Sequence, residues 1–263
     1  MNTPLNVTTE NALGMFVLNR PKALNAIDPP MLEALEDALN NAEKNEQLRV
    51  IVISGTGERA FCAGADIKCI RNMHGAQKRR FIEDAYRLFE RIANFPLPSI
   101  AAIQGFALGG GLELAMSCDL RIADESSSLG LPEMALGSVP SFGAAQRLPL
   151  LVGHGVAMEL LMTGRQLCAE EARQCGLVNQ AVPKGHALAA ARQMGSVLSL
   201  RSREALRYGK VAIRQSASPA LAAAFHALVS DACHQGPEYQ ANTDKFLNAS
   251  SSAAAIHARA NLK

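Results

Sequence analysis

Two glutamates in apolar surroundings are the first candidates for chemistry in this sequence. Glu113 stands between two leucines, and Glu133 lies between Pro132 and Met134. Burial raises the pKa of a carboxyl group, and two neighbouring carboxylates separate each other's pKa values, so such a pair can divide the roles of acid and base. Two glutamates with purely structural roles remain the alternative.

Two segments rich in small residues could bind negative charge through their backbones. Gly109–Gly111 precede a helical run, so the first N–H groups of that helix are bare and suit an anion. No Gly-Lys-Ser/Thr follows, which excludes a nucleotide-binding P-loop. Small residues at 63–65, within Phe61–Lys68, let a ligand approach the backbone closely. Taken alone, an ordinary strand-to-helix turn with Asp66 near the helix start explains this second segment better.

Strands and helices that must position these segments alternate along the first part of the chain. Val50–Ile53 and Ser99–Ile103 are short apolar runs typical of buried strands. Asp28 and the prolines after it predict a helix start, with apolar residues at 31, 32, 35 and 39, and a second helix is predicted over 81–92. This alternation predicts an α/β core.

Past about residue 185 the pattern changes to helices alone. Ala-rich helices are predicted over 187–200, 202–213 and 219–232, with no strand between them. We therefore expect two regions, an α/β core at 1–195 that holds the site and a helical region at 196–263. Such a tail packs either on a neighbouring subunit or on its own core, and the sequence leaves both open.

Composition excludes several classes of function. With 263 residues, 48% hydrophobic, and a formal net charge of +2, the chain is typical of a soluble globular protein and a poor nucleic-acid binder. Lys78-Arg79-Arg80 is interpreted as a solvated helix face. The six cysteines form no C-x-x-C pair and no zinc pattern with the histidines, so no metal is expected. With no signal peptide and no long apolar span, we expect a cytoplasmic protein that does not enter a membrane.

In their order and spacing, the segments around Ala63, Gly110 and Glu133 resemble the crotonase (enoyl-CoA hydratase/isomerase) family. Asn19–Ala26, Ser117–Ala123 and Gln146–Pro149 also resemble signatures of this family. The resemblance covers residues 10–185 and weakens toward the C-terminus. It implies a superhelix of ββα units with a C-terminal helical trimerisation region, and hence a homotrimer or a homohexamer built as a dimer of trimers.

The resemblance also implies an acyl-CoA thioester as substrate, without a metal or a redox cofactor, since coenzyme A is part of the substrate. The N–H groups of Ala65 and Gly110 would hold the thioester oxygen as charge builds on it. The substrate-binding residues that the resemblance implies are Lys22, Ala23, Leu24, Ala63, Ala65, Asp66, Ile67, Lys68, Gly110, Ser141 and Phe142.

For the two glutamates, the resemblance implies the roles found in hydratases. Glu113 would act as the base that activates water toward C3 of a 2-enoyl-CoA, and Glu133 as the acid that protonates C2, the two titrating as a coupled unit. Isomerases of the family need mainly one carboxylate, so the pair favours hydration. A 3,2-enoyl-CoA isomerase or another reaction of the family stays open, and so does a non-catalytic scaffold that binds acyl-CoA or RNA.

The sequence departs from the family pattern in two places. Ser141 stands where the family often has a glycine, and Phe142 adds bulk beside it, which would narrow the acyl pocket, add a hydroxyl near the water or alter the reaction. The C-terminal region lacks the Phe and Lys that often reach a neighbour's coenzyme, and Gln240 and Thr243 stand near those places.

Overall fold

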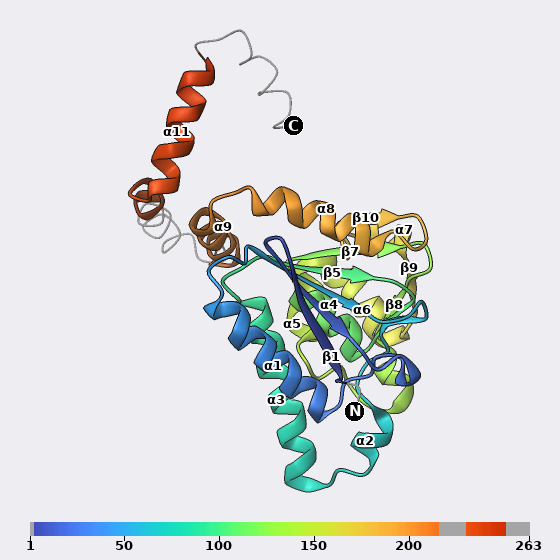
Figure 1. Cartoon of the computed structure of the whole chain (residues 1–263). Helices are drawn as coiled ribbons and strands as arrows, with labels where there is room; N and C mark the ends of the chain where they lie inside the picture. The colour runs from blue at the N-terminus through green and yellow to red at the C-terminus, as the bar shows by residue number, and fades with distance from the viewer. Residues whose placement is uncertain (1–2, 216–229, 251–263) are drawn as a thin grey trace. The chain divides into compact units, whose positions relative to one another are not determined.

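The computed structural model describes residues 3–215 and 230–250 (Figure 1). The chain divides into two compact units, Met1–Leu200 and Arg201–Lys263. The predicted boundary at 195 lies inside helix α8 (Ala187–Ser199), whereas the division follows the end of that helix. The role of the second unit in oligomerisation stays a prediction.

Two sheets build the first unit. The larger has the strand order β1-β2-β3-β5-β7-β10 and the smaller the order β4-β6-β8-β9. In the larger sheet β1 and β2 form an antiparallel hairpin and the other pairs are parallel. The strands are β1 (Leu5–Glu10), β2 (Leu13–Leu18), β3 (Val50–Gly55), β4 (Ala60–Cys62), β5 (Ser99–Ile103), β6 (Phe106–Leu108), β7 (Leu120–Asp124), β8 (Ser128–Gly130), β9 (Leu167–Cys168) and β10 (Gln180–Val182).

A repeated ββα unit links the two sheets. Three times, a strand of the larger sheet passes through a short turn into a strand of the smaller sheet and then into a helix, as β3–β4, β5–β6 and β7–β8 do. Because β4, β6 and β8 pair in parallel, their carboxyl ends meet at one edge of the smaller sheet. The segments that follow these strands begin at Ala63, Gly109 and Leu131. The predicted superhelix therefore brings the three candidate segments together.

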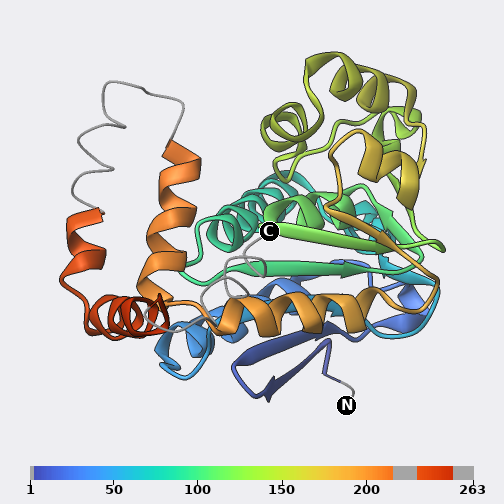
Figure 2. The ribbon, with the colours of Figure 1, turned by 90° about the horizontal axis from the view of Figure 1, so that it is seen from above.

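Helices cover both faces of the larger sheet. Helix α1 packs on β1, β2 and α3, while α8 crosses the opposite face over β2, β3, β5 and β7 (Figure 2). Apolar residues fill the space on each side and form two hydrophobic cores. The helical elements of this unit are η1 (Pro21–Ala23), α1 (Pro29–Lys44), α2 (Ile67–Arg71), α3 (Gly75–Ala93), α4 (Gly110–Ser117), η2 (Pro132–Leu136), α5 (Ala144–Val152), α6 (His154–Thr163), α7 (Ala169–Gln174) and α8. The second unit contains α9 (Arg203–Gln215) and α11 (Pro237–Ser250).

Most predicted elements form where the sequence placed them. Asp28 caps α1, since its side chain accepts a hydrogen bond from the Met31 N–H, and β3 and β5 begin at the predicted residues. Helix α3 begins six residues before the predicted start at Phe81, because its first turns are exposed and polar and carry no apolar periodicity. The helix predicted over 219–232 lies mostly outside the described residues.

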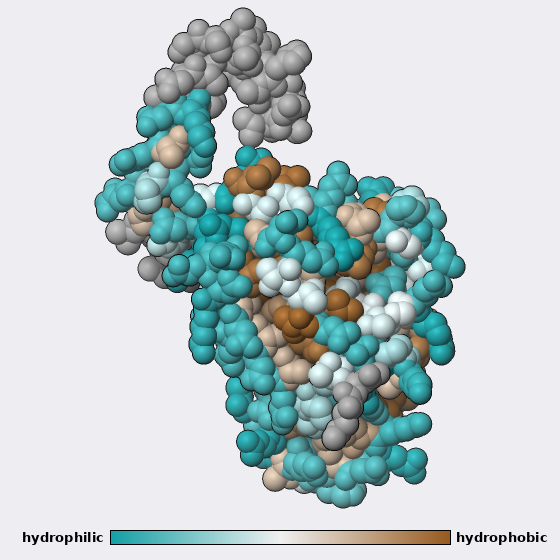
Figure 3. All heavy atoms as spheres, in the orientation of Figure 1, coloured by the Kyte–Doolittle hydropathy of each residue, from teal (hydrophilic) through white to brown (hydrophobic). Residues whose placement is uncertain are grey.

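The surface and the cysteines bear on the expectations from composition. On the face shown in Figure 3, hydrophilic side chains cover most of the area, and smaller hydrophobic areas show between them. All six cysteines are free thiols. Within residues 3–215 and 230–250, no helix is both long and apolar enough to span a bilayer, and no three His, Cys, Asp or Glu side chains gather as metal ligands would.

Candidate active site

A cavity of about 420 Å³ lies where the three ββα units meet. Both candidate glutamates line it, although they come from different elements, α4 and η2. The lining consists of Ala63, Gly64, Ala65, Ile67, Ile70, Arg71, Lys78, Ile82, Gly109, Gly110, Glu113, Pro132, Glu133, Leu136, Ser138, Val139, Ser141 and Phe142. Apolar groups therefore surround a small number of acidic and basic side chains, as in small-molecule sites generally.

Two backbone N–H groups lie side by side in this cavity. A methyl group on Gly64 would lie 3.4 Å from the nitrogen of Gly110, and one on Gly110 would lie 3.4 Å from the nitrogen of Ala65. Gly110 opens α4, so its N–H has no acceptor within the helix. Neither the Ala65 nor the Gly110 N–H bonds to another described residue outside the helices and strands. Both donors are therefore available to an oxygen atom of a ligand, and the helix dipole favours negative charge there.

Gly109 allows the chain to turn into α4 next to Glu133. Its φ of +51° is left-handed, which disfavours residues with a Cβ. A Cβ at this position would also lie 2.5 Å from Oε1 of Glu133. Glycine at position 109 thus admits the carboxylate to the start of the helix.

Glu113 is buried on α4, with 1% of its surface exposed. Its Oε1 accepts hydrogen bonds from the N–H groups of Phe142 (2.8 Å) and Ala144 (2.9 Å). Burial raises the pKa of Glu113 to about 7, with the nearby Glu133 adding to the rise, while the two N–H groups and Arg147 oppose it. Glu113 is therefore close to half ionised at neutral pH, as suits a general base.

Glu133 has a different environment. Its Oε2 is buried, and within the described part of the chain it has no hydrogen-bond partner. Burial raises the pKa of Glu133, and its own backbone N–H opposes the rise. A buried carboxylate oxygen without a donor is costly when charged, so this environment favours the protonated form.

A partly buried ion cluster holds the loop that carries Ala65. Arg20 Nη2 bonds to Asp66 Oδ2 at 2.9 Å and to Asp28 Oδ2 at 3.0 Å. Burial acts to raise the pKa of Asp66, but the hydrogen bond and charge of Arg20 and the N–H groups at the start of α2 bring it below its usual value. The Ile27 N–H also bonds to the Gly64 carbonyl at 2.8 Å. These bonds fix the loop from residue 63 to 66.

The structure brings most, though not all, of the predicted site residues together. Those that line the cavity are Ala63, Ala65, Ile67, Gly110, Glu113, Glu133, Ser141 and Phe142; those that do not are Lys22, Ala23, Leu24, Asp66 and Lys68. The second group lies close to the loop, since the Leu24 carbonyl accepts from the Ala63 N–H and Asp66 caps α2. A contact of this group with coenzyme A stays a prediction.

Sequence reasoning missed two cations at the cavity and the role of Arg20. Arg71 and Lys78 line the cavity, although Lys78 belongs to the basic triplet that was interpreted only as a solvated face. The triplet is exposed, as predicted. Arg20 was part of a recognised signature, but its partner Asp66 lies 46 residues away, and nothing in the sequence pairs them.

Comparison with known proteins decides the family. The sequence model of the enoyl-CoA hydratase/isomerase family matches residues 8–240. The chain belongs to this family. It is 37% identical over 206 residues to the short-chain-enoyl-CoA hydratase of Clostridium acetobutylicum, covering 78% of this chain and 79% of that one. It is 38% identical over 206 residues to the crotonyl-CoA hydratase of Syntrophomonas wolfei, with the same shares.

Solved structures of the family share the fold. The crystal structure of enoyl-CoA hydratase from Bacillus anthracis superposes with a TM-score of 0.90 at 33% identity, covering 93% of this chain and 96% of that chain. DspI from Pseudomonas aeruginosa gives a TM-score of 0.90 at 30% identity, covering 94% and 95%. The predicted crotonase fold is thus confirmed, and the protein is an enzyme of the crotonase family.

Proposed function

We propose that this protein is an enoyl-CoA hydratase, which adds water across the 2,3 double bond of a 2-enoyl-CoA thioester. One observation carries the proposal: Glu113 and Glu133 line a single cavity with the adjacent N–H groups of Ala65 and Gly110. The names of the two bacterial relatives, both hydratases of short enoyl-CoA esters, support it.

The two N–H groups would stabilise the charge that the reaction creates. When water adds at C3, electron density moves through C2 to the thioester oxygen and forms an enolate. Donors on Ala65 and Gly110 that already face that oxygen need no reorganisation, and losing one such donor costs roughly 3–4 kcal/mol in other enzymes. The start of α4 strengthens the Gly110 donor through the helix dipole.

The hydrogen bonds of the two glutamates support a division of roles. Glu113 accepts two backbone N–H groups, which favour its carboxylate form, so it takes the proton from the attacking water. Glu133 has no donor to its buried Oε2, which favours its carboxylic acid, so it gives a proton to C2. Hydroxyl ends on C3 and hydrogen on C2, and the pair then redistributes its single proton.

Hydration is not a redox reaction, and a carboxylate pair with two N–H donors supplies its acid, its base and its charge stabilisation. We therefore propose that the protein needs no metal or redox cofactor. Assembly into a homotrimer or a homohexamer and a cytoplasmic location remain predictions.

The test follows the loss of the conjugated-thioester absorbance of crotonyl-CoA. We expect turnover by the wild-type protein and a loss of orders of magnitude in Glu113→Gln and Glu133→Gln, with a cooperative unfolding transition no less stable than that of the wild type as the folding control. Near-full activity of both variants would refute the proposal. Conversion of a 3-enoyl-CoA that survives the loss of one glutamate but not the other would identify an isomerase, and acyl-CoA binding without turnover would identify a non-catalytic scaffold.

A further inference from the structure

Phe142 occupies the inner end of the active-site cavity. Only 4% of it is exposed, and its ring packs edge-to-face against Phe81 (centroids 6.0 Å apart) and Phe89 (5.6 Å). A methyl group on Gly110 would come within 2.9 Å of the ring. The ring is therefore held on three sides and leaves no free space between itself and Gly110.

The position of Phe142 relative to the reacting atoms follows from its backbone. Its N–H holds the Glu113 carboxylate at 2.8 Å, and its ring touches Gly110, whose N–H faces the proposed thioester oxygen. An acyl carbon beyond the double bond would lie near the Glu113 carboxylate and the proposed oxygen site, and Phe142 borders both.

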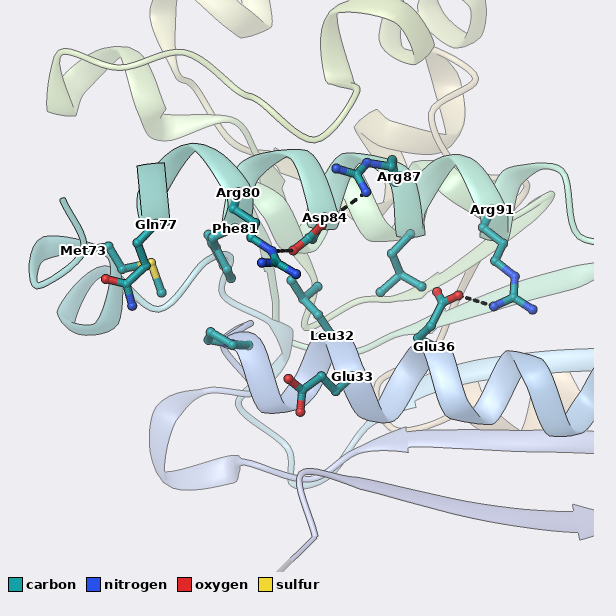
Figure 4. A pocket seen from close by; sticks show the side chains of 12 residues that line it. Leu32, Glu33, Glu36, Met73, Gln77, Arg80, Phe81, Asp84, Arg87 and Arg91 are labelled. Carbon is teal, nitrogen blue, oxygen red and sulfur yellow. Dashed lines mark hydrogen bonds and ion pairs between the residues drawn. The ribbon is translucent and has the colours of Figure 1, made fainter. Parts of the chain in front are cut away.

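A second hollow lies on the other side of α3. It is a groove of about 580 Å³ between α1 and α3, and Figure 4 shows Leu32, Met73 and Phe81 among its apolar lining. Its rim carries ion pairs, such as Arg80–Asp84 at 3.6 Å and Arg91–Glu36. Its apolar part has the chemistry to accept a hydrocarbon chain.

Two aromatic rings separate this groove from the active site. Phe81 lines the groove, Phe142 lines the active-site cavity, and their rings contact each other. Phe89 packs against Phe142 but lines neither hollow. We refer to Phe81 and Phe142 as the aromatic wall.

We propose that the aromatic wall is the specificity determinant of this enzyme: Phe142, backed by Phe81, restricts the site to short acyl chains, and its removal opens the cavity toward the α1–α3 groove and admits longer chains. The inference rests on the hydratase function proposed above. It concerns only the aromatic side chains, because the bond from Phe142 to Glu113 comes from the backbone N–H and survives substitution.

Steady-state hydration of crotonyl-CoA, 2-octenoyl-CoA and 2-decenoyl-CoA tests this. We expect the wild-type protein to prefer crotonyl-CoA, and Phe142→Ala to raise kcat/KM for 2-decenoyl-CoA by about tenfold or more, since each methylene accommodated in an apolar site contributes several-fold. Phe142→Leu, which disturbs the core less, should shift the preference toward 2-octenoyl-CoA, and Phe81→Leu should act in the same direction.

Phe89→Leu is the matched control, because it loosens the same aromatic cluster without opening the wall; its chain-length preference should equal that of the wild type. The inference is wrong if the wild-type protein hydrates 2-decenoyl-CoA as well as crotonyl-CoA, or if the leucine variants of Phe81, Phe89 and Phe142 change the preference alike.

Calorimetric binding of butyryl-CoA and decanoyl-CoA separates this inference from the proposed function. A wild-type preference for butyryl-CoA that Phe142→Ala removes supports the wall even in a protein without turnover. Equal binding of both esters by wild type and variant overturns the wall while leaving hydration of crotonyl-CoA, and with it the proposed function, intact.

Discussion

The active-site cavity and the α1–α3 groove are both lined by charged side chains, but the charges are exposed and paired in the groove, whereas two acids lie together in the cavity. In the groove, acids face bases: Arg87 pairs with Asp84 at 3.5 Å and Arg91 with Glu36, and all four side chains are at least a quarter exposed. In the cavity, two acids of the same sign lie together, and Glu113 is 1% exposed. Exposed opposite charges cost little and contribute little, whereas buried like charges are costly.

The larger hollow is therefore the one without candidate chemistry. Size alone would have favoured the groove, at about 580 Å³ against about 420 Å³. The cavity differs from the groove because it contains polar groups without a hydrogen-bond partner in the described part of the chain. These groups are the Glu133 Oε2 and the N–H groups of Ala65 and Gly110. This difference can be tested from both sides.

The largest effect should come from replacing either cavity glutamate with glutamine, and the same replacement in the groove should have almost none. Glu113→Gln and Glu133→Gln should each lower kcat for crotonyl-CoA by about 10²- to 10⁴-fold, because each removes a proton-transfer group. The double variant should lose little more, because the two act as a unit. Glu36→Gln in the groove should stay within about twofold of wild type, and a comparable loss there would erase the distinction.

Although it lowers activity, Glu113→Gln should stabilise the protein. Glu113 has a folded-state pKa of about 7 against an ordinary value of 4.5, so the folded state holds its proton more tightly and wild-type stability falls as pH rises between these values. Gln does not titrate and can still accept the N–H groups of Phe142 and Ala144. Glu113→Gln should thus match wild type below pH 4.5 and gain up to about 3 kcal/mol above pH 7.

Urea unfolding of both proteins across that pH range measures the difference. A constant difference at all pH values would show that burial of the charge is not its cause. Glu83→Gln, which changes an exposed acid on α3, serves as the control, with no comparable gain on the alkaline side.

A third effect concerns backbone geometry at the site. Gly109→Ala should lower kcat by about a hundredfold, because the new Cβ would lie 2.5 Å from Glu133 Oε1 and displace that carboxylate. Gly75 offers a matched control: it also sits at a helix start, its φ is +52° against +51°, and an added Cβ meets nothing within 4 Å. Gly75→Ala should cost about 1 kcal/mol of stability and leave the rate unchanged. Equal rate losses in both variants would point to backbone strain alone.

The smallest effect is the pH dependence of the wild-type rate. Because Glu113 must be ionised, log(kcat/KM) should fall by about one per pH unit below its pKa of about 7. A second fall of the rate at higher pH would mark the loss of the one proton that the pair of glutamates shares. Glu113→Gln should lack the acidic limb in its residual activity; a limb that persists would assign it to another group.

The elements that position the site could be predicted because their signals are local. The β-branched run at Val50–Ile53, the proline-marked start of α1 and the glycines before α4 each specify one element. Spacing and resemblance then placed Glu113, Glu133, Ala65 and Gly110 in one site, and the structure finds all four at the same cavity.

What the sequence did not predict depends on contacts across the fold. Periodicity indicates that Phe81 and Phe89 on α3 face the core but not that Phe142, more than 50 residues further along the chain, packs against both. The same holds for Arg20 and Asp66. Gln240 and Thr243, near the places of the Phe and Lys that relatives often have, lie on α11, and the helix predicted over 219–232 lies mostly outside the described residues.

Phe142 divides its two tasks between different parts of one residue: its amide nitrogen orients Glu113, while its ring bounds the cavity. Any amino acid other than proline supplies the same amide, so this position can exchange its side chain without disturbing the base. A substitution at position 142, whether by evolution or by design, should therefore change the preference among acyl-CoA esters and keep the hydrogen bond that orients Glu113.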